Sequence, residues 1–249
     1  MISPHNPYTQ DLDRRLLPPV WADGTFAHVL GTDQLGRDLL SRLMFGAQVS
    51  LAVAVASVLI AGVIGVLAGV VSGFYGGLVD EVLMRLADLR LALPFILLII
   101  AVIAVFGPGL YKIVVILGLT GWVLYARVVR AEVLSLKERD FIAAARGLGA
   151  SDSWLMLRHI LPNTIASAVV LGSLELAQMV VAESALSFLG LGVQLPTPSW
   201  GNMLGESRDY ILSNWWLATF PGMAIALTAV SANLVGDWLR DLLDPRLQL

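Results

Sequence analysis

One stretch of the sequence, VSLAVAVASVLIAGVIGVLAGVVSG over residues 49–73, constrains the fold more than any other. It has no charged side chain over about 25 residues, and a helix of that length is long enough to cross a hydrocarbon layer about 30 Å thick. Composition agrees, because only 14% of the 249 residues are charged and the mean hydropathy is +0.78. Soluble domains carry charge nearer a quarter of their residues, so the sequence predicts an all-α polytopic membrane protein.

Further apolar runs predict the remaining membrane spans. Two of them meet at Gly107-Pro108-Gly109, which breaks a helix and predicts an antiparallel hairpin. The five predicted spans cover residues 48–73, 91–109, 111–130, 165–191 and 215–236. They form one membrane domain over residues 47–249.

Residues 1–46 are polar and rich in proline, and they contain no apolar run of 15 residues. The sequence therefore predicts neither a signal peptide nor a membrane helix before about Gln48. An amphipathic helix is expected near residues 33–46, with Thr32 or Asp33 as its N-cap and leucines on the membrane surface. The alternative for GTDQLGRD, residues 31–38, is a contact with a partner protein.

The distribution of basic residues predicts the orientation. Alternate loops after the first span place ten lysines and arginines on one side of the membrane and two on the other. Positive charge is retained in the cytoplasm, so the loop over 137–162 and the C-terminus are predicted to be cytoplasmic. The N-terminal segment is then extracytoplasmic, although it holds four arginines.

Glycines repeat every four residues in the first span, at Gly65, Gly69 and Gly73. Small residues at this spacing form a stripe on which another helix can pack closely. The pattern predicts helix packing and implies no function by itself.

Sequence motifs of enzymes are absent. There is no P-loop, HExxH or GxSxG motif, the three histidines (His5, His28 and His159) are scattered, and there is no cysteine. We therefore expect no catalytic residue, no metal site and no cofactor. A net charge of −3 argues against nucleic acid as a partner. The function classes that remain are transport, signalling and scaffolding.

The segment FIAAARGLGASDSWLMLRHILPN, residues 141–163, is too elaborate for a linker between two spans. Six of its side chains are small, and such a surface lets another protein approach closely. Ser151 is a suitable N-cap with Asp152 in the first turn, and Pro162 is expected to end the helix. The segment is predicted to form two short helices with a glycine break, and to act as a docking element.

The same segment resembles the EAA motif of the permeases of binding-protein-dependent ABC importers. Ala144, Ala145, Gly149, Leu161 and Pro162 fall on the pattern, whereas Ala143 replaces its glutamate and His159 replaces an isoleucine. RHILPN resembles the dipeptide, oligopeptide and nickel branch in particular. Residues 28–51 and 183–204 also resemble that branch, so the likeness covers most of the chain.

The resemblance implies a type I ABC importer transmembrane domain in the inner membrane of a bacterium or archaeon. Such a permease forms half of a channel for peptides, or for nickel or another small solute. It implies three partners: a second permease, cytoplasmic ATPases that hydrolyse the ATP, and an extracytoplasmic binding protein. It also implies that relatives carry one more helix upstream. The residues expected to couple to the ATPase are Ala143, Ala144, Ala145, Arg146, Gly147, Gly149, Ala150, Ser151, Leu161 and Pro162.

Two carboxylates, Glu175 and Glu183, lie in the fourth predicted span. Carboxylates are costly in a membrane and usually face a bundle interior or a water-filled path. They are candidates for the translocation path, or for the proton relay of a secondary transporter, and the alternative is a hydrogen-bonded packing role. A secondary transporter usually has two similar halves, and no internal repeat is visible. A purely structural subunit would leave the small-residue loop unexplained.

Overall fold

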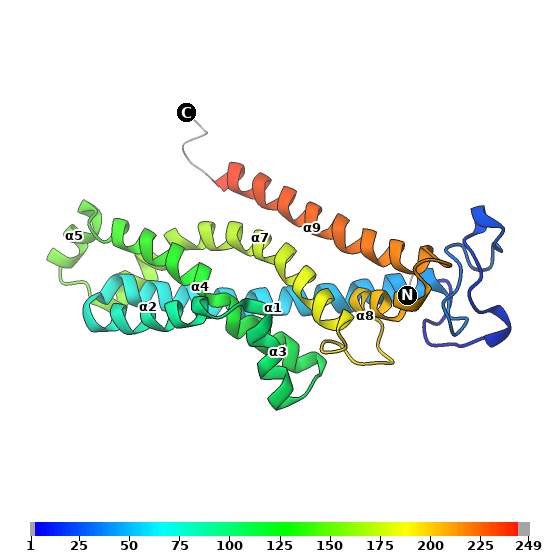
Figure 1. Ribbon diagram of the computed structural model, residues 1–249. Coiled ribbons are helices and arrows are strands. Elements are labelled where there is room, and N and C mark those ends of the chain that lie inside the picture. Colours follow the sequence, from blue (N-terminus) through cyan, green and yellow to red (C-terminus); the bar gives the residue numbers. More distant parts are fainter. Residues whose placement is uncertain (1–2, 244–249) are drawn as a thin grey trace. The chain divides into compact units, whose positions relative to one another are not determined.

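A computed structural model describes residues 3–243, and nearly all regular structure in them is helical (Figure 1). Within these residues the one β feature is an isolated antiparallel bridge between Thr32 and Asp38. The α-helices are α1 (Leu39–Tyr75), α2 (Gly77–Ala92), α3 (Phe95–Phe106), α4 (Leu110–Leu136), α5 (Asp140–Gly147), α6 (Asp152–Leu155), α7 (Leu161–Phe188), α8 (Trp200–Glu206) and α9 (Trp216–Leu243). Short 3₁₀ turns occupy Leu12–Arg14, Val20–Ala22 and Arg208–Tyr210, and a π-helical turn covers Met156–Ile160.

Four helical segments of the described residues are long and apolar enough to cross a membrane. They are Leu39–Tyr75, Leu110–Leu136, Asp152–Phe188 and Trp216–Leu242. A fifth candidate is the pair α2 and α3, which bends by 90°. Proline disfavours helical geometry in the preceding residue, and Leu93 before Pro94 is extended. The span predicted over 91–109 therefore corresponds to the 12-residue α3, with a separate helix before the break.

The chain divides into two compact units, and several helices contribute to both. The first contains the residues up to Val55, Val102–Val114 and Gln178–Ser231. The second contains Ala56–Ala101, Val115–Ala177 and the residues from Ala232 onward. Each unit is described separately below.

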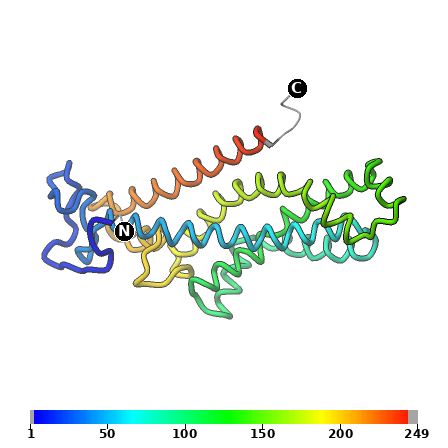
Figure 2. Tube along the Cα trace, turned by 180° about the vertical axis from the view of Figure 1, so that it is seen from behind, coloured from blue at the N-terminus to red at the C-terminus, as the bar shows by residue number. Residues whose placement is uncertain are grey.

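In the first unit, the N-terminal segment folds as irregular loops over the beginning of α1 (Figure 2). Asp38 caps α1, because its Oδ2 accepts a hydrogen bond from the Ser41 backbone N–H at 2.8 Å. The helix therefore starts at Leu39 and continues directly into the first span. The helix expected near 33–46 begins later, because residues 39–46 are the first turns of α1 and Asp38 is the cap in place of Thr32 or Asp33, which lie buried in the preceding loops.

A buried ion network joins this segment to α8. Asp33 accepts from the Arg37 Nε at 2.6 Å and also pairs with Arg42, while Glu206 lies 3.1 Å from Arg37 and 2.6 Å from Arg42. The Trp200 indole N–H donates to the Leu43 carbonyl at 3.0 Å. The start of α1 and α8 are therefore held together by both charge and packing.

In the second unit, α1 and α4 lie side by side at very short range (Figure 1). A Cβ added at Gly65 would lie 2.4 Å from the Trp122 carbonyl oxygen, and one at Gly69 would lie 2.7 Å from that of Ala126. At Gly73 the nearest atom would be the Val133 Cβ, at 2.8 Å. The glycine stripe is the surface on which α4 packs, since any side chain there would separate the helices.

Candidate functional site

The 141–163 segment forms two short helices around a sharp turn. α5 ends at Gly147, and Gly149 has a φ of +88°, a conformation that favours glycine. The Ser151 hydroxyl then accepts from the Trp154 backbone N–H at 3.3 Å and caps α6. The glycine break and the serine cap are thus present where the sequence predicts them.

Pro162 differs from the expectation that it would end the helix. Asp152 to Phe188 is continuous enough to count as one span, with Pro162 in the first turn of α7. Proline lacks an N–H and clashes with the carbonyl four residues before it. The π-helical turn over Met156–Ile160 lies just before the proline, and such turns widen the helix locally. The 141–163 segment is therefore joined to α7 without a break.

The inner side of the segment is packed into a buried apolar cluster. Ile142 of α5, Leu155 of α6 and Ile160 are almost inaccessible. They pack with residues of α1 and α4, namely Val70, Phe74, Val129 and Val133. The cluster attaches the segment to α1 and α4. The segment is also joined to α7, because α7 follows it directly in the chain.

The outer side of the segment is open and apolar. A hollow of about 480 Å³ is lined by Ala145, Leu148, Gly149, Ala150, Ser151 and Trp154. Leu148 is 91% exposed and Trp154 47% exposed, although both are large apolar residues. A Cβ added at Gly147 or Gly149 would have no neighbour within 4 Å. Large exposed apolar side chains beside small residues such as alanine and glycine are typical of a protein-binding surface.

The other predicted coupling residues do not line this hollow. Ala143 and Ala144 are exposed on α5, and Pro162 is exposed at the start of α7, whereas Leu161 is half-buried. The Arg146 guanidinium lies 5.7 Å from the Phe74 ring and 3.8 Å from Asp152. Four of the predicted residues, Ala145, Gly149, Ala150 and Ser151, therefore line the hollow, whereas Leu161 packs against the apolar cluster.

Two interactions near the segment were not predicted from the sequence. The His159 ring lies 4.8 Å from the Trp154 ring and 5.9 Å from the Phe141 ring, so His159 takes part in an aromatic group. Asp80 of α2 binds Arg130 of α4 through two hydrogen bonds of 2.5 Å. Asp80 and Arg130 are 50 positions apart in the sequence, so no local pattern indicates that pair.

Glu175 lies in the second unit and is only 7% exposed. Its electrostatic partner is Arg90, whose Nε donates to the Thr120 carbonyl at 2.6 Å. Tyr125 is nearby, and its buried hydroxyl has no hydrogen-bond partner among the described residues. The carboxyl group of Glu175 is thus within electrostatic range of an arginine and of a phenol.

Glu183 lies in the first unit and is fully buried. The Ser187 hydroxyl donates to it at 2.6 Å, and Ser50, Ser184 and Ser199 are further hydroxyl partners. These serines come from α1, from α7 and from the N-cap of α8. Hydrogen bonds to several hydroxyls offset the cost of burying the carboxyl group.

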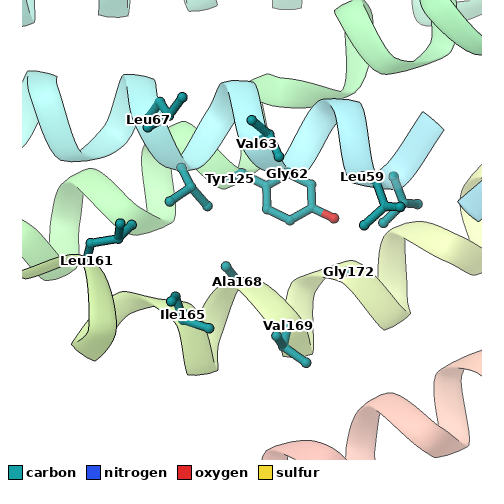
Figure 3. Close-up of a pocket in the computed structure, with 12 residues that line it drawn as sticks. Leu59, Gly62, Val63, Leu67, Tyr125, Leu161, Ile165, Ala168, Val169 and Gly172 are labelled. Carbon is teal, nitrogen blue, oxygen red and sulfur yellow. The ribbon is translucent and has the colours of Figure 1, made fainter. Parts of the chain in front are cut away.

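An apolar groove of about 480 Å³ lies in the second unit between α1 and α7 (Figure 3). Leu59, Val63 and Leu67 form one wall, and Ile165 and Val169 form the other. Tyr125 lies between them, and the small residues Gly62, Ala168 and Gly172 leave room above its ring. The lining of the groove is almost entirely apolar, since the hydroxyl group of Tyr125 is itself buried.

These features define a class: a polytopic helical membrane protein with an exposed apolar hollow on a loop whose inner side packs against long helices. Residues 65–249 match the family model described as the inner membrane component of binding-protein-dependent transport systems. The chain belongs to this family.

Peptide and glutathione permeases are among its relatives. A di/tripeptide transport system permease of Pseudomonas aeruginosa is 44% identical over 99% of this chain and 82% of that protein. A probable D,D-dipeptide transport system permease of Escherichia coli is 40% identical over 98% and 80%. A glutathione transport system permease of Pectobacterium atrosepticum is 44% identical over 89% and 74%.

A solved structure shows the same fold. An inward-facing form of the MetNI methionine ABC transporter matches with a TM-score of 0.64 at 20% identity, over 82% of this chain and 97% of that one. The fold is therefore the type I transmembrane domain of ABC importers, as expected. The chain is a multi-pass permease subunit of the inner membrane.

Proposed function

We propose that this chain forms half of the translocation pathway of an ATP-driven importer for di- or oligopeptides. Relatives that carry peptides or glutathione support the substrate class. The docking hollow around Gly149 supports the coupling to a separate ATPase, and it is the observation that carries the proposal. ATP hydrolysis belongs to that ATPase, since the sequence of this chain has no P-loop.

The mounting of the docking loop suggests how movement is transmitted. Ile142, Leu155 and Ile160 fasten the loop to α1 and α4, and the loop continues into α7. When the ATPases close around ATP, the loop moves with them as a rigid body and tilts these helices. Alternation between inward-facing and outward-facing states follows from that tilt.

The proposal includes an orientation and two further partners. The docking loop faces the cytoplasm, where the ATPases lie, and the N-terminal segment faces the other side. There a solute-binding protein delivers the peptide, and a homologous second permease completes the channel. Glu175 is the stronger candidate for the pathway, because the hydroxyl partners of Glu183 already give that carboxyl group a packing role.

Two alternatives remain distinct from the peptide importer. Nickel or another small solute is possible in the same family, because the binding protein selects the ligand. A proton-coupled transporter using Glu175 and Glu183 belongs to a different class, and the comparisons do not favour it.

The docking surface is tested by Gly149→Glu. We expect the variant to reach the membrane normally and to lose co-purification with the ATPase, because the new side chain fills the hollow. The measurement is the amount of ATPase recovered with the tagged permease, relative to wild type.

The matched control is Gly190→Glu. Gly190 has a φ of +76° and no neighbour within 4 Å of an added Cβ, so backbone strain and space are like those at Gly149. Gly190 follows the C-terminal end of α7, whereas the docking loop precedes the N-terminal end of the same helix. The two glycines therefore lie at opposite ends of α7. Gly190→Glu should retain the ATPase. Normal ATPase recovery with Gly149→Glu would contradict the proposal.

A further inference from the structure

Three side chains that are scattered in the sequence meet near the beginning of α1. His5, His28 and Asp38 each offer one possible metal ligand atom, and these atoms all lie within 4.8 Å of one another. All three residues belong to the first unit, where the N-terminal segment, blue in Figure 2, returns to α1. The established family function assigns no role to this cluster.

The cluster is held in place by its own hydrogen bonds. Asp38 Oδ2 accepts from both the backbone N–H and the hydroxyl of Ser41, and Oδ1 lies 2.9 Å from the His28 Nδ1. The His5 backbone N–H donates to the same Ser41 hydroxyl oxygen at 3.0 Å. The main chain at His5 and the side chains of His28 and Asp38 are therefore positioned before any ligand arrives.

The spacing of the ligand atoms fits a metal ion. His28 Nδ1 lies 2.9 Å from Asp38 Oδ1, and His5 Nδ1 lies 3.7 Å from Asp38 Oδ2. In a tetrahedral site with bonds of about 2.0–2.1 Å, neighbouring ligand atoms are about 3.4 Å apart. One observed distance is shorter than that value and the other is longer, and they end on different oxygens of Asp38, so the side chains have to shift to place one oxygen and both nitrogens around an ion. A bound ion would take the place of the proton that His28 and Asp38 share.

Exposure at one side leaves a position open. His28 and Asp38 are buried, but the His5 side chain is 43% exposed. The His5 ring can therefore rotate to bring its nitrogen closer to the ligand atoms of His28 and Asp38. The exposed side also admits a water molecule as a fourth ligand. Three protein ligands and one water form a common arrangement for zinc.

The donor atoms select the class of ion. Two imidazole nitrogens and one carboxylate oxygen suit zinc and the neighbouring first-row metals, whereas calcium and magnesium prefer oxygen ligands throughout. We propose that His5, His28 and Asp38 bind one divalent transition-metal ion of the zinc class and so fasten the N-terminal segment to α1. Without the metal, the same groups are joined only by their hydrogen bonds.

Zinc titration of the full chain distinguishes these two states. The protein is purified in detergent with a tag that contains no histidine, made metal-free, and titrated with Zn²⁺ by calorimetry. We expect one equivalent to bind. Removing one ligand in His5→Ala should weaken binding at least about tenfold, and His28→Gln should do the same.

The control is the third histidine, in His159→Ala, which lies in the docking loop and should bind zinc as wild type does. Limited proteolysis gives a second measurement, because zinc should slow cleavage of residues 1–38 in wild type but not in His5→Ala. His5 is exposed, so this variant is expected to fold. Absence of stoichiometric binding, or equal affinity and protection in wild type and His5→Ala, would overturn the proposal. The outcome is independent of ATPase docking and of peptide transport.

Discussion

At the scale of single residues, the buried ion network joins charged side chains that are far apart in the sequence. Arg37 and Arg42 share the carboxylates of Asp33 and Glu206, and all but Glu206 are almost fully buried. Removing one partner from such a network leaves an arginine that is shielded from water and incompletely paired. The network therefore stabilises the contact between the N-terminal segment and α8 only while it is complete.

We expect Glu206→Gln to destabilise the protein by about 2 kcal/mol, since the neutral amide replaces a charge-assisted partner of two arginines. The measurement is thermal unfolding in detergent, with earlier proteolysis of the N-terminal segment as a local readout.

The matched control is Glu81→Gln, which makes the same chemical change in the exposed pair with Arg85. Exposed pairs contribute about 0.5 kcal/mol or less, so this variant should unfold close to wild type. Equal effects of the two substitutions would show that burial of the network does not matter.

At the scale of helices, the contact between α1 and α4 decides where substitutions are tolerated. We expect Gly69→Ala to destabilise the protein by about 1–3 kcal/mol, because its Cβ would lie 2.7 Å from the Ala126 carbonyl oxygen and 2.8 Å from the Val129 Cβ. The helices would have to separate to admit the methyl group. Thermal unfolding measures the effect.

The control in the same helix is Gly62→Ala. Its Cβ would lie 3.6 Å from the Tyr125 ring, an ordinary contact at the edge of the groove in Figure 3. Alanine favours helix over glycine by up to about 1 kcal/mol, so Gly62→Ala should be neutral or stabilising. A loss of stability as large as that of Gly69→Ala would contradict the packing argument.

At the scale of the whole molecule, the source of energy separates the peptide importer from a proton-coupled carrier. We expect labelled dipeptide uptake, by the permease reconstituted with its partners, to require ATP and to persist when a protonophore collapses the proton gradient. In the same assay, Glu175→Gln should retain the ATPase but slow uptake, because it alters the polar cluster with Arg90. Uptake by the chain alone, driven by a proton gradient, would reject the ATP-driven importer.

Local patterns were sufficient for some parts of the molecule. The charge-free run over 49–73, the glycine break at Gly149 and the Ser151 cap each depend on neighbours in the chain, so the sequence predicts them directly. Pro162 and Pro94 show the limit of such patterns. Both prolines are visible in the sequence, but whether a helix ends, bends or continues past a proline depends on how the surrounding turns adjust.

The sequence by itself determined that this protein is a helical membrane protein and, through its resemblance to a permease family, predicted a docking loop, because hydropathy, small residues and motif spacing act over short stretches of chain. Only the tertiary structure decided which distant groups meet. Glu206 reaches Arg37 across 169 residues, and His5 and His28 converge on Asp38 although the sequence predicted no metal site. Buried polar groups choose partners by position in space, and no local pattern records that position.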